Sequence, residues 1–317
     1  MINSYSIGID IGGTNTDIGL VSADGFCIAR KNLPTGDYYD ASVYVADLCK
    51  AIQEMMTEEC VKEIDGIGIA APMGNYYTGC IDNATNLNFR GTTHLDSLIH
   101  EHLDVPVTVS NDANAAAYGE LVYGGAKGMK NFITFTLGTG VGSGIVIDGK
   151  LLHGKTGNAG ELGHAILIPG GRLCGCGRKG CLETYASATA IKKTARELLE
   201  AHPEYRGLLT EVPPEKLTSK QVGDAANAGD PIAVEVFKMT GNWLGIAMAN
   251  AVAFSSPEAI FLMGGPVKAG EVLLQPVRES FKKHLCFVYD KSVEVLVSKL
   301  PGNEAAILGA AALTKAK

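Results

Sequence analysis

One histidine and three cysteines gather in a short, glycine-rich segment, HAILIPGGRLCGCGRKGCLE, which covers residues 164–183. His164, Cys174, Cys176 and Cys181 have the spacing H-x9-C-x-C-x4-C. One imidazole nitrogen and three thiolates form the ligand set of a closed tetrahedral zinc site, with no position left for a reactive water. The pattern therefore predicts a structural Zn²⁺ that fixes a loop with little core of its own.

Disulfide formation and redox chemistry are the alternatives for these cysteines. The start of the chain, MINSYSIGID, lacks the basic and apolar regions of a secretory signal, so we expect a cytoplasmic protein, in which disulfides are disfavoured. The C-x-C spacing is also a poor match to the redox motif C-x-x-C. The other five cysteines are scattered, most of them in apolar segments, which predicts buried thiols.

Two glutamates flank this cluster. Glu161 lies three residues before His164 in GELGH, and Glu183 follows the last clustered cysteine by two residues. Carboxylates and imidazoles are the usual groups that hold neighbouring hydroxyls, and one ring nitrogen of a zinc-bound His164 would still face a ligand. Surface salt bridges are the alternative for either glutamate.

The segment SNDANAAAYGE, residues 110–120, places Asp112 at the end of a predicted strand and the start of a predicted helix. A carboxylate there can act as a general base that accepts a hydroxyl proton. It can also be a helix cap, which is the interpretation that this motif alone favours. Asn111 offers a side-chain amide for hydrogen bonds to a hydroxyl.

DIGGTN, residues 10–15, predicts a glycine hairpin that could hold an anion. Successive backbone N–H groups of Gly12, Gly13 and Thr14 can converge there with no side chain in the way. Asp10 is well placed to hold Mg²⁺ through water. No lysine follows the glycines and a strand follows in place of a helix, so this is not a Walker loop.

Two further glycine turns follow later in the chain. LGTGVGSG, residues 137–144, is a second copy of the hairpin, and two such hairpins would suit the phosphates of a nucleoside triphosphate. LMGGP, residues 262–266, places a glycine pair at the end of a strand, where it could admit the flat face of a nucleoside or be a plain turn.

The elements that position these motifs repeat. Residues 4–33 and 131–154 each read as strand, glycine turn, strand, turn containing Asp-Gly, and strand. The repeat predicts an internal duplication with two similar lobes and a cleft, although meanders are common enough for a chance match. Further helices are predicted at 41–58, 94–103, 113–124, 187–200, 219–227, 230–254, 270–284 and 303–316, with strands at 65–72, 105–110, 258–265 and 293–298.

Length and composition limit the class of protein. The 317 residues are 46% hydrophobic and 19% charged, and the net charge is -7 without a basic patch, which argues against nucleic acid as a partner. No apolar run reaches about 18 residues, so no membrane span is expected. We expect an α/β chain with a small lobe, residues 1–118 plus 301–317, and a large lobe, residues 119–300, that carries the zinc loop.

Taken together, the motifs resemble the ROK family of sugar kinases and sugar-responsive repressors. DIGGTN, NDANAAAYGE, LGTGVGSG and GNAGELGHAILIPGGRLCGCGRKGCLE occur in the family's order and cover essentially the whole chain. The resemblance implies the actin-like, hexokinase-type ATPase fold (ribonuclease H-like), in which two lobes close over sugar and ATP. It implies Asp112 as the catalytic base and Zn²⁺ on the cluster of His164 and three cysteines.

The resemblance also implies two sets of binding residues. The sugar would be held by Gly74 in APMG, Asn86 in TNLNF, Asn111, Asp112, Glu161, His164 and Glu183. ATP with Mg²⁺ would be held by Asp10, Gly12, Gly13, Thr14, Asn15, Gly138, Thr139, Gly140, Gly264 and Gly265.

Within the family the motifs are most similar to those of bacterial glucokinases, which implies phosphorylation of glucose at the 6-hydroxyl by a homodimer or homotetramer. Asn15 stands where many members have lysine, which could shift the preferred phosphate donor, and NLNFR replaces an ANLPW-like loop. N-acetylmannosamine, N-acetylglucosamine, fructose, mannose and allose are alternative substrates. A sugar-sensing regulator without activity is a further alternative, but Asp112 and both glycine hairpins are intact, and the early first strand leaves no room for a DNA-binding domain.

Overall fold

An antiparallel meander opens the chain, as the sequence predicts. The computed structural model describes residues 4–289, 293–302 and 304–316. Strands β1 (Tyr5–Ile11), β2 (Thr16–Ser22) and β3 (Cys27–Leu33) pair in sequence order. Side chains alternate between the faces of β1, so its three isoleucines point into the core while Gly8 faces the other way.

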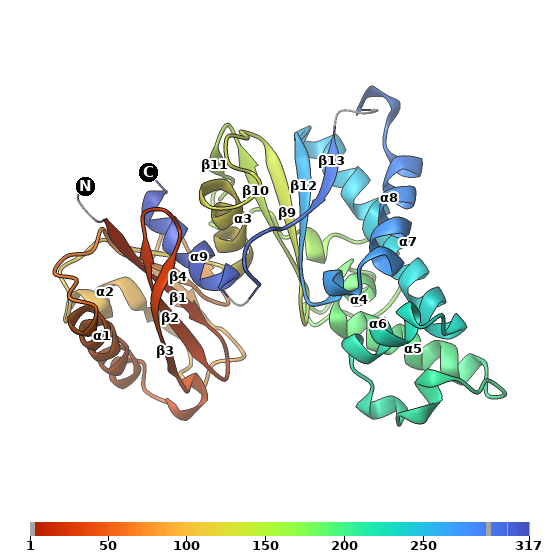
Figure 1. Ribbon diagram of the computed structural model, residues 1–317, viewed down its shortest axis with the longest axis horizontal. Coiled ribbons are helices and arrows are strands. Elements are labelled where there is room, and N and C mark those ends of the chain that lie inside the picture. The colour runs from red at the N-terminus through yellow and green to blue at the C-terminus, as the bar shows by residue number, and fades with distance from the viewer. Residues whose placement is uncertain (1–3, 290–292, 303, 317) are drawn as a thin grey trace. The chain divides into compact units, whose positions relative to one another are not determined.

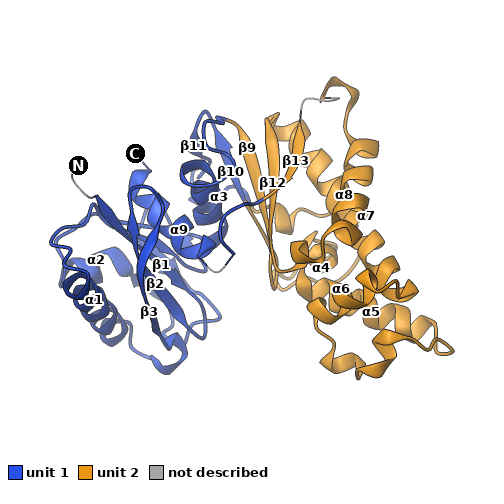
Figure 2. Ribbon diagram, viewed as in Figure 1, with its two compact units in different colours: residues 1–130, 144–160, 298–317 blue, residues 131–143, 161–297 orange. Residues whose placement is uncertain are grey.

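The chain divides into two compact units, which Figure 2 colours separately. Unit 1 contains residues 1–130, 144–160 and 298–317, and unit 2 contains residues 131–143 and 161–297. Compared with the lobes expected from the sequence, residues 119–130, 144–160 and 298–300 group with the first unit.

Unit 1 is built on a mixed sheet with the strand order β3-β2-β1-β4-β8. β4 (Ile67–Ala70) and β8 (Val107–Ser110) run parallel to β1. Helices α1 (Ala41–Glu58) and α2 (Leu95–His100) cover one face, where apolar side chains of the sheet and of α1 form the core (Figure 1). A small sheet of β5 (Gly74–Asn75), β6 (Cys80–Asp82) and β7 (Thr92–His94) belongs to the same unit, and the sequence did not predict it.

The other face of this sheet is covered by the last helix, α9 (Ala305–Ala312). Glycines make the contact possible because the helix backbone lies directly on the strands. A Cβ atom added to Gly68 would come within 1.9 Å of the Ala310 carbonyl oxygen, and one added to Gly8 within 2.1 Å of the Ile307 carbonyl oxygen. Helix α3 (Asp112–Val122) packs against α9.

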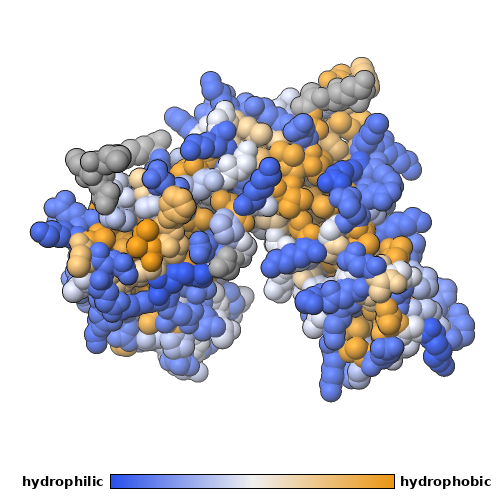
Figure 3. Space-filling view, viewed as in Figure 1, coloured by the Kyte–Doolittle hydropathy of each residue, from blue (hydrophilic) through white to orange (hydrophobic). Residues whose placement is uncertain are grey.

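The second sheet has the order β11-β10-β9-β12-β13, and the boundary between the units falls within it. β12 (Ala259–Gly264) pairs in parallel with β9 and β13. Helices α7 and α8 pack closely where Gly241 and Gly245 of α7 admit the backbone of α8. Figure 3 shows hydrophobic residues gathered on unit 2 over the sheet.

The bounds of the other strands and helices named so far are as follows. The remaining strands are β9 (Phe132–Leu137), β10 (Val141–Ile147), β11 (Lys150–Leu151) and β13 (Glu294–Val297), and the helices are α4 (Glu183–Ala186), α5 (Ala188–Ala201), α6 (Ser219–Asn227), α7 (Pro231–Ser255) and α8 (Glu271–His284).

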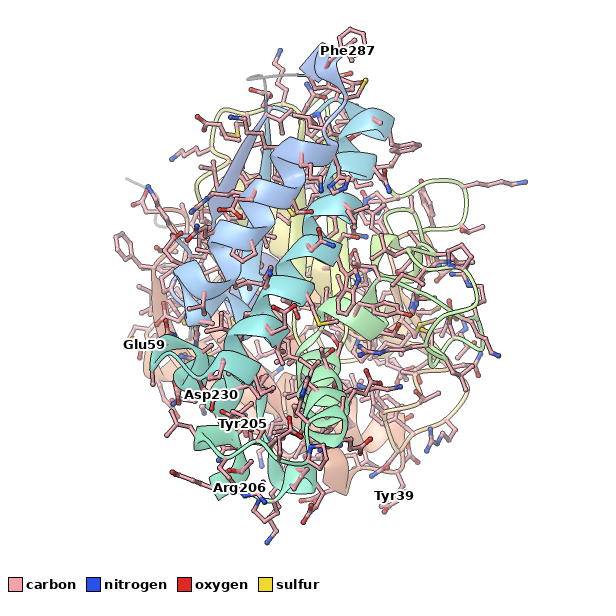
Figure 4. All side chains as sticks on the ribbon, turned by 90° about the vertical axis from the view of Figure 1, so that its right-hand side faces the viewer. Tyr39, Glu59, Tyr205, Arg206, Asp230 and Phe287 are labelled. Atoms are coloured by element: carbon pink, nitrogen blue, oxygen red, sulfur yellow. The ribbon has the colours of Figure 1, made fainter. Side chains whose placement is uncertain are left out.

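Short 3-10 helices lie in several connections, and the connection that follows α5 is hydrogen-bonded to the start of α7. Tyr205 donates its hydroxyl hydrogen to Asp230, which also caps α7 by accepting the N–H of Ala233 (Figure 4). The 3-10 helices are η1 (Thr35–Asp37), η2 (Leu162–His164), η3 (Leu208–Glu211), η4 (Pro214–Lys216), η5 (Pro266–Ala269), η6 (Phe287–Tyr289) and η7 (Leu313–Lys315).

The scattered cysteines follow the prediction only in part. Cys49 and Cys80 are buried, and Cys27 is partly buried, but Cys60 and Cys286 are exposed. Both exposed residues come directly after the last turn of a helix, where the chain turns outward, so the expectation of buried thiols is wrong for them. Among the described residues, no helix is both long and apolar enough to cross a bilayer.

Candidate active site and metal centre

Asp112 is the first residue of α3, directly after β8. The cap of this helix is Asn111, whose side-chain oxygen accepts the N–H of Asn114 at 2.7 Å, so the capping role that the motif alone favoured for Asp112 belongs to its neighbour. Asp112 Oδ1 accepts the N–H of Ala113 at 2.8 Å. Asp112 is exposed to solvent. Desolvation by the surrounding protein nevertheless raises the pKa of its carboxyl above the ordinary value. The hydrogen bond from the Ala113 N–H opposes this rise in pKa.

Asp10 lies at the same edge of the sheet as Asp112. The parallel strands pair Asp10 with Ala70 and Ala70 with Ser110, so the carboxyl ends of β1 and β8 meet at one level. Ligands of open α/β sheets bind outside this edge. Burial raises the pKa of Asp10 to about 6, and the charges of Asp112 and Asp17 add to the shift. Acidic groups that raise one another's pKa in this way favour a bound cation.

The first glycine hairpin joins β1 to β2. The N–H of Gly12 donates to the Asn15 carbonyl at 2.9 Å, and the Asn86 carbonyl oxygen lies so close to Gly13 that an added Cβ would come within 2.5 Å of it. The loop that carries Asn86 is therefore packed on the hairpin. Thr14 and Asn15 are exposed at its tip.

Gly74 lies against the end of β8. Its N–H donates to the Ala71 carbonyl at 3.0 Å, and a Cβ on Gly74 would come within 2.4 Å of the Ser110 carbonyl oxygen. Because Ser110 directly precedes Asn111 and Asp112, this packing brings the Gly74 loop to the residues at the start of α3. Unit 1 thus contains these predicted site residues: Asp10, Gly12, Gly13, Thr14, Asn15, Gly74, Asn86, Asn111 and Asp112.

The other predicted site residues belong to unit 2. In the second hairpin the N–H of Gly138 donates to the Gly140 carbonyl at 3.0 Å, and Thr139 is exposed between them. Gly264 pairs with Leu137, the residue before this hairpin, and an added Cβ would come within 2.1 Å of the Leu137 carbonyl oxygen. The structure therefore places the turn formed by Gly264 and Gly265 beside the second hairpin.

The predicted metal ligands come together in unit 2. One ligand atom from each of His164, Cys174, Cys176 and Cys181 lies within 4.8 Å of all the others. His164 Nδ1 is 3.5 Å from Cys174 Sγ, and Cys176 Sγ is 3.7 Å from Cys181 Sγ. Tetrahedral zinc, with Zn–S bonds of about 2.3 Å and a Zn–N bond of about 2.1 Å, sets its sulfurs about 3.8 Å apart and its nitrogen about 3.6 Å from sulfur. The donor set therefore fits zinc in type and in spacing.

A tight turn presents two of these thiols. The N–H of Cys174 donates to the Arg178 carbonyl at 2.9 Å, and Gly177 supplies the left-handed backbone, with φ of 84°, that the turn requires. Hydrogen bonds from the backbone and guanidinium of Arg178 lower the pKa of Cys176 to about 6, whereas burial raises that of Cys174 to about 12. The Arg178 guanidinium also donates to the His164 carbonyl at 2.8 Å.

Glu183 joins the thiol cluster to the second hairpin, a link that the sequence did not predict. Its Oε1 lies 3.2 Å from Cys174 Sγ and 3.8 Å from His164 Nδ1, while its Oε2 accepts the N–H of Val141 at 3.4 Å. Glu183 begins helix α4, and Glu161 directly precedes η2, which ends at His164. Each glutamate therefore lies within three residues of a member of the cluster.

Three residues that no sequence motif indicates form contacts directly after Gly74 in the structure. Asn75 and Tyr76 follow it in the chain, and His153 contacts Tyr76 through its ring. An aromatic contact between two loops that are distant in the sequence produces no periodic pattern of residues. The adjacent tyrosines of NYY, residues 75–77, were the sequence feature that could have indicated it.

Comparison with known proteins identifies similar sequences and structures. A glucokinase of Halalkalibacterium halodurans is 36% identical over 99% of this chain and 96% of its own length. The crystal structure of a ROK family glucokinase from Streptomyces griseus, in complex with glucose and AMPPNP, matches with a TM-score of 0.82 and 33% identity over 99% of this chain and 100% of that one. A ROK family transcriptional regulator, a homologue of the Escherichia coli MLC protein, matches with a TM-score of 0.88 and 27% identity over 99% of this chain and 78% of that one.

The model of the ROK family matches residues 6–317, and these solved structures share the actin-like ATPase fold that the sequence predicts. Because the match extends over nearly the whole chain, the protein belongs to the ROK family.

Proposed function

We propose that the protein is a glucokinase, which transfers the γ-phosphoryl group of ATP to the 6-hydroxyl of glucose. The observation that carries the proposal is the placement of Asp112 and Asp10 at one edge of the unit 1 sheet, next to a glycine hairpin. Glucokinases similar over nearly the whole chain support it, one of them solved with glucose and AMPPNP.

Asp112 acts as the general base. Its carboxylate accepts the proton of the 6-hydroxyl while O6 forms a bond to the γ-phosphorus, and the bond between that phosphorus and the β–γ bridging oxygen breaks to release ADP. The raised pKa makes Asp112 a stronger base than an ordinary aspartate. Capping by Asn111 holds the start of α3 and with it the backbone of Asp112.

The two glycine hairpins hold the phosphates of ATP, because exposed backbone N–H groups and small side chains let the nucleotide approach. Asp10 would hold Mg²⁺, which would neutralise charge on the phosphoryl oxygens. Gly264 and Gly265 lie beside the second hairpin and leave room for the nucleoside. Asn15, in place of the lysine of many relatives, removes one cation from this region.

The sugar hydroxyls are bound by two groups of residues. Asn111, Asp112, Gly74 and Asn86 contribute from unit 1, and Glu161, His164 and Glu183 from unit 2. Zinc on the three cysteines and His164 Nδ1 is structural, since all four ligands come from the protein. Binding through Nδ1 leaves Nε2 of His164 for the sugar.

A kinase of another hexose, or of N-acetylmannosamine or N-acetylglucosamine, is the nearest alternative, since one hydroxyl or one acetyl group separates these substrates. Similarity to a transcriptional regulator favours a sugar sensor as a second alternative. The intact base and hairpins favour the kinase over the sensor.

We also propose a cytoplasmic homodimer or homotetramer. All eight cysteines are free thiols, and a cluster that binds zinc through thiolates is favoured by a reducing compartment. The oligomeric state rests on the family resemblance, and light scattering coupled to size exclusion measures it.

ATP-dependent phosphorylation of glucose, mannose, fructose, allose and the two N-acetylhexosamines, with Mg²⁺, tests the proposal. We expect glucose to have the highest kcat/KM. A higher value for another sugar would reassign the substrate and keep the mechanism. Sugar binding without turnover, also with polyphosphate as donor, would contradict the kinase and support the sensor.

A further inference from the structure

Two loops of unit 1 are fastened together beside Gly74. The rings of Tyr76 and His153 stack with their centroids 3.9 Å apart and their planes 8° from parallel. Asn75 Nδ2 donates to the Thr156 carbonyl at 3.0 Å, across 81 residues of sequence. We refer to Asn75, Tyr76, His153 and Thr156 as the loop clasp.

The loop clasp is tightly packed. Asn75 is buried, and its Oδ1 accepts the N–H of Tyr77 at 3.0 Å, so both ends of its amide are used. A Cβ added to Gly157 would come within 2.8 Å of that same oxygen. Burial lowers the pKa of His153, and its Nδ1 is buried without a hydrogen-bond partner, so a neutral ring is held here by stacking.

Each side of the loop clasp leads directly to a residue of the proposed sugar site. On one side Asn75 follows Gly74, which packs on Ser110 immediately before Asn111 and Asp112. On the other side the N–H of Ala159 donates to the His153 carbonyl at 3.1 Å, which keeps this loop compact up to Gly160. Unit 1 ends there, and the chain continues into Glu161.

We infer that the loop clasp is a positioning element for the sugar, which sets glucose affinity and the preference among hexoses. Gly74 has no side chain, so it can contact a sugar only through its backbone, and the conformation of its loop decides where that backbone lies. The inference rests on the proposed function, because it assumes that Gly74 binds sugar.

The position of the loop clasp predicts which kinetic constant it controls. The described contacts of the two glycine hairpins do not include any of its residues, so the KM for ATP should not depend on it. Contacts to sugar hydroxyls away from the reacting oxygen stabilise the bound substrate and the transition state equally. Loss of such contacts therefore raises the KM for glucose and leaves kcat unchanged.

Kinetics of four variants test the inference. Tyr76→Leu removes the stack, and Tyr76→Phe keeps an aromatic ring. Asn75→Asp removes the donor to Thr156 but keeps the acceptor for Tyr77. Tyr39→Leu changes a tyrosine of the same unit that is 78% exposed and serves as a matched control.

We expect Tyr76→Leu and Asn75→Asp to raise the KM for glucose at least about 10-fold, with kcat within about 3-fold and the KM for ATP within about 2-fold of the wild type. Tyr76→Phe and Tyr39→Leu should retain the wild-type constants. Glucose affinity from calorimetry should fall in parallel with the rise in KM.

A KM for glucose within about 2-fold of the wild type in both disruptive variants would overturn the inference, and so would equal losses for glucose and ATP. If Tyr76→Leu does not fold, Asn75→Asp decides alone. A wild type that binds glucose without phosphorylating it would contradict the proposed kinase, while calorimetry on the same variants still tests the loop clasp. A wild type that binds none of the hexoses would overturn both.

Discussion

Two adjacent residues at the start of α3 have separate tasks. The side chain of Asn111 accepts one of the free N–H groups of the first helical turn, that of Asn114. Asp112 therefore does not have to cap the helix. Had the cap been Asp112, an ionised carboxylate would be stabilised there and would be a weaker base. The order Asn-Asp in this strand-to-helix junction thus favours proton acceptance by the second residue.

Replacement of Asp112 separates binding from chemistry. Asp112→Asn keeps the size of the side chain and removes its basicity. We expect kcat for glucose to fall at least about 100-fold, in the range usual for a lost general base, with a calorimetric glucose affinity within about 5-fold of the wild type. Near-normal turnover would exclude Asp112 as the base, and Asp104→Asn provides a matched control at an exposed aspartate of the same unit, outside the proposed site.

Asp10 carries a cost in stability that depends on pH. Its pKa in the folded chain is about 6, above the ordinary value of 3.8, so folding disfavours its ionised form. The unfolded chain releases this proton first, so the wild type loses stability as pH rises from about 4 to about 6, and the full cost is present above that window.

Asp10→Asn should therefore stabilise the protein at pH 7.5 in buffer without Mg²⁺, by about 1–3 kcal/mol in the free energy of unfolding. At pH 4 the gain should shrink, because Asp10 is then protonated in the folded chain and only about half ionised in the unfolded chain. Urea unfolding at the two pH values measures the difference. An identical effect at both values would show that charge is not the cause.

At the scale of elements, the loop of residues 164–183 has little packing of its own. Its backbone pairs mainly through short turns and isolated bridges, and few of its side chains reach the core. The proposed zinc would therefore replace packing as the means of holding Glu161, His164 and Glu183 in place.

Cys181→Ser tests this dependence, with Cys60→Ser, at an exposed cysteine, as its control. We expect about one zinc per chain by elemental analysis of the wild type and of Cys60→Ser, and little in Cys181→Ser. The latter should also have a lower melting temperature and a higher KM for glucose. Full activity of a metal-free protein would contradict a structural role for zinc.

The sequence predicts elements well where the pattern is local. The duplicated meanders, the helices from α1 to α9 other than the short α4, and the gathering of His164 with three cysteines follow from alternation, helical spacing and short ligand spacing. The loop clasp could not be predicted, because Tyr76 and His153 meet only after the chain has folded. Likewise, Cys60 and Cys286 each lie just after an amphipathic helix, and only the direction of the chain after each helix exposes them.

At the scale of the whole molecule, the two ends of the chain complete one unit. Helix α9 lies on the sheet that contains β1, and the backbone of the helix meets Gly68 without space for a methyl group. The chain passes between the units four times, so neither unit is a continuous piece of sequence.

Gly68→Ala should push α9 off the sheet. We expect a loss of about 2–4 kcal/mol in the free energy of unfolding, at the upper end for a substitution that overpacks a buried contact. Gly302→Ala, where an added Cβ meets nothing within 4 Å, is the matched control and should change stability by less than about 0.5 kcal/mol. Equal effects of the two variants in urea unfolding would show that the close approach of α9 is not the reason why residue 68 has to be glycine.

The late arrival of α9 also matters while the protein is being made. Strand β1 leaves the ribosome long before the helix that covers its glycine face, because β1 ends at Ile11 and α9 begins only at Ala305. At about 5–20 residues per second, that face waits roughly 15–60 seconds for its partner. A nascent chain stalled before residue 305 should therefore still present this sheet to chaperones and proteases, long after the rest of unit 1 has emerged.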